Sequence, residues 1–499
     1  MRLETGYTIG TLHFWAKTDN SKAYSQFIAQ KYDPPISFEL KDEIPWEEYK
    51  RTCFKFVKIK DVSMNKVVNL ILKDLNKYIC VITGTSRPYF IVTTFNYDEL
   101  GIKYPVYTRQ SKNGIIESFE NHKYPFLIGN SKKPTPWIRL WIDWDARRSY
   151  KEEVFQSLNV PCPKNALNTF NGYHITRELA ESRGTQDLSH FWKFIKTVWC
   201  SNNEELYYWV ISWLAFQVQH PLIKMHSCLV LRGIEGIGKG IVIQLLKTII
   251  GSEYFLQPSS PNDVLGTFNS LTANKALIFL DELVWGGDKE KSGVFKKLIT
   301  ESECTINEKH ITNRKSTNCY NITIASNEDW VVPAGPNARR ATVVDVNNTA
   351  TTEEKDAVRL TCPFSLAKAL YNWDLSHFDH RKIVTTTALA NQKELSCSDT
   401  MKYVIDRVRN GTFPYNEKLL PGTCFAEFKS MFPHNKYTTV QSFCKDLKKI
   451  INYKKVQGTD GKRKLVFPNE IDCQQSINAY FQQDMFIDDK SDCDEVEVE

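Results

Sequence analysis

The stretch HSCLVLRGIEGIGKG, residues 226–240, decides the fold of the central part of the chain. It contains an apolar run at 228–231 and then a glycine-rich turn. The segment IVIQLLKTII at 241–250 has the apolar pattern of a helix. A strand, a glycine-rich loop and a helix in this order are typical of a phosphate-binding P-loop. In such a loop backbone N–H groups turn inward around a polyphosphate, and the helix N-terminus adds its positive end.

The predicted phosphate-binding residues are the glycines of this turn and its lysine, namely Gly233, Gly236, Gly238, Lys239 and Gly240. We expect Lys239 to reach the β- and γ-phosphates. Gly240 departs from the usual motif, in which Ser or Thr gives a hydroxyl ligand to Mg²⁺. Because Mg²⁺ keeps several waters in its octahedron, a water can replace that hydroxyl. A chain that binds nucleotide without hydrolysing it is the alternative.

Two apolar runs beyond the loop end in polar side chains. Residues 276–280 predict a buried strand that ends at Asp281 and Glu282, and residues 321–326 predict another that ends at Asn327. Ligands of open α/β sheets bind at the carboxyl ends of strands, so these side chains can converge on the loop. We expect Asp281 to hold Mg²⁺, directly or through water. Glu282 is placed to polarise the water that attacks the γ-phosphate.

Basic residues flank the second of these strands. Arg339 and Arg340 follow it, just after a Gly-Pro pair. Before it, residues 305–315 alternate around an asparagine, as a β-hairpin does. Four side chains of this hairpin fit a grip on the phosphates of one nucleic acid strand: Lys309, His310, Arg314 and Lys315. The alternative is a solvated basic hairpin without a ligand.

The order of these elements resembles the superfamily 3 helicases, which are AAA+ ATPases of viral and plasmid replication. Within them it is most similar to the primase-helicases of poxvirus, phage and virophage type, in which GKG also replaces GKS or GKT. The resemblance covers about residues 136–346, with a looser match to about 470. Besides the motifs above it includes LNTFNG at 167–172, WVISWLAFQVQHP at 209–221 and VLGTFN at 264–269.

This resemblance implies ATP and Mg²⁺ as cofactors and single-stranded and forked DNA as partners. Asn327 matches the sensor that orients the lytic water, and Arg339 or Arg340 matches an arginine finger. Such a finger acts across a subunit boundary and can raise the rate about 10³–10⁵-fold. The resemblance therefore also implies a ring, most simply a homohexamer. A primase or polymerase is a further expected partner.

The composition favours a soluble chain of several domains. The 499 residues are 42% hydrophobic and 24% charged, and no apolar stretch approaches the about 18 residues that span a bilayer. The start lacks a basic-then-apolar signal sequence. The 13 cysteines include no Cys-x-x-Cys pair, so neither a zinc module nor a disulfide framework is indicated. We expect an intracellular protein without membrane contact, in either nucleus or cytoplasm.

Charge separates sharply in the C-terminal part. Residues 401–467 hold 14 Lys and Arg against 5 Asp and Glu, whereas residues 471–499 hold 1 lysine against 9 acids. Segments 423–432 and 440–451 predict two helices, the second capped by Thr438 or Thr439, and Thr459-Asp-Gly predicts a hairpin turn between basic strands. Two helices and a basic hairpin form a winged-helix module, which binds either DNA or a protein partner. The acidic end is expected to be disordered.

The first 135 residues are the least informative. A helix at 67–75 and strands at 78–84 and 87–95 predict a small α+β domain of unknown role. A further apolar run at 137–142 ends in Asp143 and Asp145, the Asp-x-Asp form of a metal-binding strand end in primases. Because no Ser-x-His motif follows, salt bridges to Arg147 and Arg148 are the favoured interpretation.

The expected fold is an α/β P-loop AAA+ core with a helical collar, an N-terminal α+β domain and a C-terminal winged-helix-like domain. The predicted bounds are 1–135 for the N-terminal domain, 136–225 for the collar, 226–346 for the core, 347–396 for a helical lid or linker, 397–470 for the basic winged-helix-like domain and 471–499 for the acidic tail.

The predicted function is ATP-driven translocation on single-stranded DNA, with unwinding of duplex during replication of a virus or mobile element. A bifunctional primase-helicase is one alternative. The other is a DNA-stimulated ATPase or initiator that does not unwind.

Overall fold

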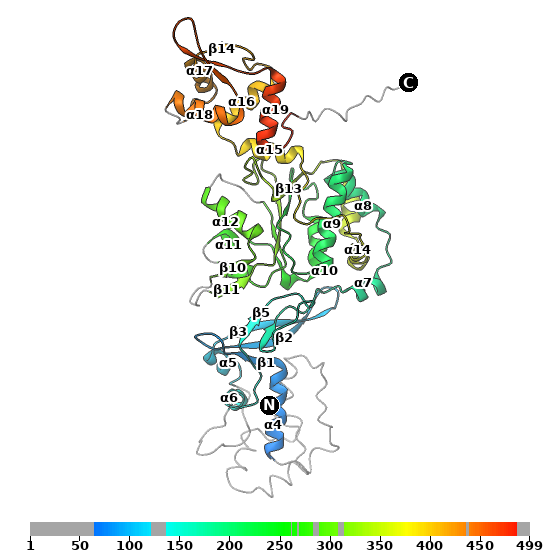
Figure 1. The fold of residues 1–499 in the computed structure, drawn as a ribbon. Helices are drawn as coiled ribbons and strands as arrows, with labels where there is room; N and C mark the ends of the chain where they lie inside the picture. Colours follow the sequence, from blue (N-terminus) through cyan, green and yellow to red (C-terminus); the bar gives the residue numbers. More distant parts are fainter. Residues whose placement is uncertain are drawn as a thin grey trace, which may run out of the picture. The chain divides into compact units, whose positions relative to one another are not determined.

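The computed structural model describes residues 64–120, 136–260, 262–266, 269–282, 289–307, 314–435 and 439–486 (Figure 1). The chain divides into two compact units, Met1–Gly172 and Tyr173–Glu499. Among the residues described, no helix has both the length and the apolar character that a bilayer crossing requires.

The first unit is built on a four-stranded sheet in the order β3-β2-β1-β4. Strands β1, β2 and β3 are antiparallel neighbours, and β4 joins β1 in parallel. Helices α4, α5 and α6 cover one face of this sheet, where Ile79, Phe90 and Trp141 share a core. The bounds are α4 Met64–Tyr78, β1 Ile79–Ile82, β2 Tyr89–Tyr97, β3 Lys103–Gln110, α5 Lys112–Ser118, α6 Trp137–Ile142, β4 Ser149–Tyr150, β5 Glu152–Val154 and β6 Ala166–Asn168.

Two predictions for this region differ from the structure. Residues 137–142 form helix α6 and not a strand, because Trp137, Ile138, Trp141 and Ile142 all turn into the core at helical spacing. Helix α6 and strand β4 complete the N-terminal sheet unit. The division of the chain therefore falls after Gly172, well beyond the expected boundary at 135.

The second unit contains a five-stranded parallel sheet in the order β13-β7-β12-β9-β8. The strands are β7 Cys228–Arg232, β8 Phe255–Leu256, β9 Leu277–Leu280, β12 Asn321–Ser326 and β13 Ala341–Asp345. All residues of β9 and β12 are buried, as expected for parallel strands covered on both faces. The strand that leads to Asn327 thus lies between the P-loop strand and the acidic strand.

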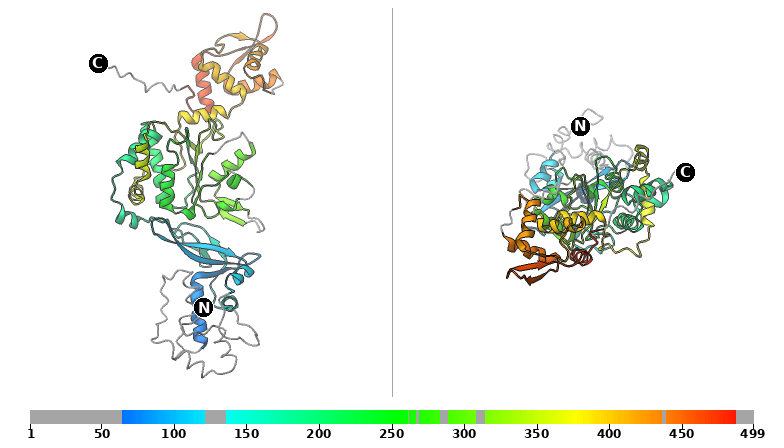
Figure 2. Two further views of the ribbon diagram at one scale, coloured as in Figure 1. Left: turned by 180° about the vertical axis from the view of Figure 1, so that it is seen from behind. Right: turned by 90° about the horizontal axis from the view of Figure 1, so that it is seen from above.

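Helices cover both faces of this sheet (Figures 1 and 2). Helices α11, α12 and α15 share one core with the strands. On the other side α10 contacts α9, α13 and α14, and α14 also contacts α7. Of the expected lid at 347–396, α13 and α14 therefore pack against α10 and the helices before the P-loop, whereas α15 packs on the opposite face of the sheet. The bounds are α7 Arg177–Arg183, α8 Ser189–Phe194, η1 Ile195–Trp199, α9 Glu204–Gln219, α10 Ile241–Ile250, η2 Ser252–Tyr254, α11 Asn262–Leu265, η3 Ser270–Thr272, α12 Lys289–Thr300, α13 Thr352–Arg359, α14 Pro363–Tyr371 and α15 Thr387–Leu395.

The C-terminal body has the predicted order of two helices and a hairpin. Helix α17 is Pro421–Met431, and α18, Val440–Ile450, is capped by Thr439, whose side chain accepts the N–H of Ser442. Strands β15 and β16 form the hairpin, and β14 joins β16. The remaining bounds are α16 Asp399–Arg409, β14 Lys418–Leu419, β15 Lys454–Gln457, β16 Arg463–Val466 and α19 Glu470–Phe481.

Helix α19 occupies residues that we expected to be a disordered tail. Cys473, Ile477 and Phe481 recur every fourth residue and are fully buried in the C-terminal core. Lys393 also donates a hydrogen bond to the carbonyl of Phe481, at 2.8 Å. Residues 471–486 therefore belong to the folded body, and 487–499 lie outside the described residues.

Candidate nucleotide-binding site

The loop between β7 and α10 has the backbone of a phosphate cradle. Gly233, Gly236 and Gly238 all have positive φ, at 153°, 76° and 106°. A Cβ atom at Gly233 would lie 2.8 Å from the carbonyl oxygen of Val346, and one at Gly238 would lie 2.8 Å from Cζ of Phe194. Both positions therefore require glycine, for conformation and for space.

Gly240 is in a different situation. Its φ of −83° and ψ of −18° are ordinary right-handed values, at the N-cap of α10. A Cβ atom there would be 3.8 Å from the ring of Phe279, which is normal van der Waals contact. Neither backbone strain nor crowding therefore requires glycine at the position where the usual motif has Ser or Thr.

Lys239 lies over the loop that precedes it. Its Nζ donates to the carbonyl oxygens of Gly233, at 2.6 Å, and Ile234, at 2.8 Å. Burial lowers the pKa of Lys239, and the nearby carboxylates of Asp281 and Glu282 oppose that shift. The ammonium is thus held at the mouth of the glycine turn, where a bound phosphate would replace the carbonyl acceptors.

Two carboxylates stand at the end of β9. Asp281 accepts a hydrogen bond at 3.2 Å from Gln257, which in turn accepts one at 3.0 Å from Gln244 on α10. Glu282 has a φ of +55°, in the left-handed region. This conformation costs a non-glycine residue on the order of 1 kcal/mol, and such residues are enriched at functional sites.

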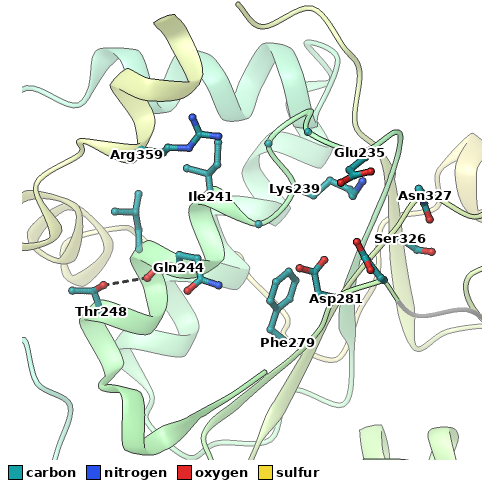
Figure 3. Close-up of a pocket in the computed structure, with 15 residues that line it drawn as sticks. Glu235, Lys239, Ile241, Gln244, Thr248, Phe279, Asp281, Ser326, Asn327 and Arg359 are labelled. Carbon is teal, nitrogen blue, oxygen red and sulfur yellow. Dashed lines mark hydrogen bonds between the residues drawn. The ribbon is translucent and has the colours of Figure 1, made fainter. Parts of the chain in front are cut away.

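These groups surround one cavity of about 630 Å³ (Figure 3). The structure brings Lys239, Asp281, Glu282 and Asn327 together on its wall, from the loop and from the ends of two neighbouring strands. The whole lining is Glu235, Gly236, Gly238, Lys239, Gly240, Ile241, Gln244, Leu245, Thr248, Phe279, Asp281, Glu282, Ser326, Asn327 and Arg359.

Sequence reasoning missed Arg359. It is the last residue of α13, about 120 residues after the loop, and its guanidinium pairs with Asp356 one turn earlier. Helix α13 packs on α10, which brings Arg359 to the cavity (Figure 3). No local pattern marks this arginine, because only the packing of α13 on α10 places it there.

Arg339 and Arg340 do not line this cavity. Strand β13 runs parallel to β7, and the carbonyl of Arg340 accepts the N–H of Cys228 at the start of β7. The P-loop follows the other end of β7, a strand length of roughly 16 Å away. Both arginines line a separate cavity of about 260 Å³, with Lys296 of α12.

The predicted hairpin is present as strands β10, Glu303–Ile306, and β11, Arg314–Thr317, which pair antiparallel. Asn269 anchors it: its side chain donates to the carbonyl of Thr305 and accepts the N–H of Asn307. Lys309 and His310 lie outside the described residues. Arg314 and Lys315 begin β11.

A partly buried lysine fixes the base of this hairpin. Nζ of Lys224 donates to the carbonyls of Leu298, at 2.5 Å, and Tyr320, at 2.6 Å, and to the side chain of Asn318, at 2.9 Å. Burial lowers the pKa of Lys224 to about 7. This lysine joins the last turn of α12 to the segment between β11 and β12.

Asp143 and Asp145 do not stand at a strand end. Asp143 is the C-cap of α6. Arg147 donates to the carbonyl of Ile142, and Arg148 donates to the hydroxyl of Tyr150 at 2.8 Å, in place of the expected salt bridges. Within the described ranges, no group of three or more His, Cys, Asp or Glu side chains is arranged to hold a metal.

Comparison with known proteins supports the fold over most of the chain. A family of unknown function (DUF5906) matches residues 231–340, from the P-loop strand to the basic pair. No curated protein matches the sequence. The A form apo structure of the NrS-1 C-terminal region is similar with a TM-score of 0.57 and 17% identity, over 80% of this chain and 98% of that chain. A second apo structure of that region gives 0.55 and 16%, over 79% and 97%.

At these identities the likeness shows a shared fold. The aligned part is much longer than the matched family segment, so the likeness is not confined to the five-stranded parallel sheet.

Proposed function

We propose that this protein is an ATP-driven helicase that translocates on single-stranded DNA and unwinds duplex in the replication of a virus or mobile element. The observation that carries the proposal is the meeting of Lys239, Asp281, Glu282 and Asn327 at one cavity beside a glycine cradle. This set contains a phosphate-binding cation, a metal-binding carboxylate, a base and a water-orienting amide, the parts that phosphoryl transfer to water requires.

The residues fit ATP and Mg²⁺. Three glycines with positive φ open the loop toward a polyphosphate, and the N-terminus of α10 adds its positive end. Asp281 would hold Mg²⁺, which neutralises charge on the β- and γ-phosphates when bound. Glu282 would accept the proton of the attacking water, and Asn327 would orient that water.

The topology supplies a route from hydrolysis to movement. Strand β12 lies between β7 and β9. A rearrangement at the γ-phosphate would therefore act on the end of β12 at Asn327. The basic hairpin β10–β11 leads directly into β12, and Lys224 fixes the hairpin base to α12. A shift of β12 would therefore move the hairpin tip, with Lys309 and Arg314, along a bound strand.

The working form we propose is a homohexameric ring. Arg339 and Arg340 lie at the sheet edge opposite the P-loop of their own subunit, so neither can complete its own site. In a ring, one of these two arginines would reach the nucleotide site of the neighbouring subunit and act there as its arginine finger. Forked DNA, and a primase or polymerase at the fork, are the partners that this activity implies.

The two alternatives have less support. A bifunctional primase-helicase would need Asp143 and Asp145 as metal ligands, and the first of them caps a helix that packs into a core. A DNA-stimulated ATPase or initiator without unwinding activity would use the same cavity. It would differ from the proposed helicase only because it does not separate the strands of a duplex.

The test compares wild type with Lys239→Ala and Glu282→Gln in ATP hydrolysis, with and without single-stranded DNA, and in unwinding of a forked duplex. We expect the alanine variant to lose turnover. The glutamine variant should keep nucleotide binding and lose hydrolysis by about 10²–10⁴-fold, because Glu282 acts only on the water. Normal turnover in Glu282→Gln would exclude it as the base. A wild-type protein that hydrolyses ATP and does not separate a forked duplex would contradict the helicase proposal and favour the ATPase without unwinding activity.

A further inference from the structure

A basic groove lies on the C-terminal body, outside the nucleotide site. It has a volume of about 370 Å³ and is formed by α18, the β15–β16 hairpin and the start of α17. Its cations are Lys445, Lys448, Lys455 and Arg463, and none of the described residues that line it is acidic. The other lining residues are Pro421, Val440, Gln441, Cys444, Tyr453 and Leu465.

The groove uses the face of α18 that the core leaves free. Gln441, Cys444, Lys445 and Lys448 follow the i, i+3, i+4, i+7 spacing of one helix face. The opposite face is anchored in the core by three fully buried side chains, those of Phe443, Leu447 and Ile450. The helix is therefore fixed to the body with a polar, basic face outward.

The hairpin presents its cations to the same groove. In the β15–β16 register Lys455 lies opposite Leu465, and Gln457 lies opposite Arg463, so these four share one face of the hairpin. Lys454 and Lys464 belong to the other face. The groove is thus bounded by cations from a helix on one side and from a two-stranded wing on the other.

The groove cations carry uncompensated charge. Neighbouring lysines have carboxylate partners: Lys449 pairs with Asp446, and Lys464 with Asp460 at 3.5 Å. The side chains of Lys445, Lys448, Lys455 and Arg463 are exposed, and within the described part of the chain none of them forms an ion pair. Four unpaired cations in one concave surface favour a polyanionic ligand.

We propose that this groove binds double-stranded DNA, with α18 toward the major groove and Lys455 and Arg463 on backbone phosphates. A single strand is less suited, since such sites stack bases on exposed aromatic rings. The aromatic residue of this groove, Tyr453, is buried and donates its hydroxyl to the carbonyl of Cys444 at 3.0 Å. Gln441, exposed on the first turn of α18, has the amide that can read a base edge.

This duplex site is independent of the proposed grip on a single strand by the basic hairpin β10–β11. Together the two would let the protein hold the intact duplex while the motor pulls one strand. The inference goes beyond the proposed function, since the groove could bind duplex in a protein that hydrolyses no ATP.

The test measures binding of the full chain to a blunt 20-base-pair duplex and to a dT strand of equal length by fluorescence anisotropy, across a salt series. The test variant is Lys455→Ala with Arg463→Ala. The matched control is Lys454→Ala with Lys464→Ala, which removes the same charge from the adjacent positions on the opposite face of the same hairpin. Thermal unfolding of each variant checks the fold.

For duplex, the slope of log affinity against log salt should flatten by about 1.8 in the test variant, from two lost phosphate contacts, with a loss of affinity of at least about 10-fold. The control should keep the wild-type slope. Binding to dT and basal ATP turnover should be unchanged in both variants.

Equal losses of duplex affinity in the test and control variants would show that the effect comes from the net charge of the hairpin and not from the groove, and would overturn the proposal. A wild type that binds polyglutamate at this groove and does not bind duplex would assign the surface to an acidic protein partner and also overturn it. A wild type that binds duplex as described and lacks ATP turnover would refute the helicase proposal and leave the groove standing.

Discussion

Replacing Gly240 by serine should leave ATP hydrolysis intact or raise it modestly. The backbone there is right-handed, and a new Cβ would be in ordinary contact with the Phe279 ring, 3.8 Å away. The added hydroxyl lies at the motif position that usually ligates Mg²⁺, where a water would otherwise serve. We therefore expect half-saturation at a lower Mg²⁺ concentration and an unchanged melting temperature.

The matched control is the same substitution two residues earlier, at Gly238. Its φ of +106° is strained for serine by about 1–3 kcal/mol. Its Cβ would lie 2.8 Å from Cζ of the buried Phe194, and crowding of that kind costs a further 1–3 kcal/mol, roughly. The sum, about 2–6 kcal/mol, should appear as a lower melting temperature, weaker nucleotide binding or both.

The assay is ATP turnover against Mg²⁺ concentration for wild type and both serine variants, with thermal unfolding of the same samples. A large loss of turnover in Gly240→Ser with an unchanged melting temperature would refute the reasoning. It would show that the bound nucleotide needs the backbone of Gly240 closer than a side chain permits.

Three further predictions concern Arg359 at the cavity, the basic hairpin and Lys224. Arg359→Ala should weaken nucleotide binding about 3–10-fold in a fluorescent-nucleotide titration, and Asp356→Ala, which frees the guanidinium, should not weaken it. The double variant Lys309→Ala with Arg314→Ala should keep basal ATP turnover and lose the stimulation of turnover by poly-dT. The slope of log affinity for dT against log salt should flatten by about 1.4. Full stimulation in this variant would show that the hairpin is a solvated surface that does not bind DNA. For Lys224, burial lowers the folded pKa to about 7, so the unfolded state binds more protons above that pH and stability should rise between pH 7 and 10. Urea unfolding of Lys224→Met should lose that rise, which is at most about 5 kcal/mol.

The core of the fold could be predicted because its strands are buried on both faces. Such strands appear in the sequence as short apolar runs, and the residue after each run is at the ligand-binding edge of the sheet. Asp281, Glu282 and Asn327 were located in this way, and the structure places all three at the cavity with Lys239.

Other parts could not be predicted, for identifiable physical reasons. The run WIRLWI at 137–142 is too short for periodicity to separate a strand from a buried helix. In 470–481 the acidic composition hid the apolar spacing of Cys473, Ile477 and Phe481, which the C-terminal core buries. Arg359 reaches the cavity through contacts between helices far apart in the sequence, and such contacts cannot be predicted from a local sequence pattern.

The position of Arg339 and Arg340 follows from topology and not from sequence distance. In a parallel sheet the chain leaves one strand at its carboxyl edge and must return to the opposite edge before the next strand begins. The segment 327–340 makes that return, so it starts at the cavity beside the glycine loop with Asn327 and ends at the far edge with Arg340. Among the residues that line the cavity, Lys239 and Arg359 carry the positive charge. In the proposed ring, a further cation at the transferred phosphate would come from a neighbouring subunit, and Arg339 and Arg340 at the far edge of the sheet are the side chains that we propose for this role.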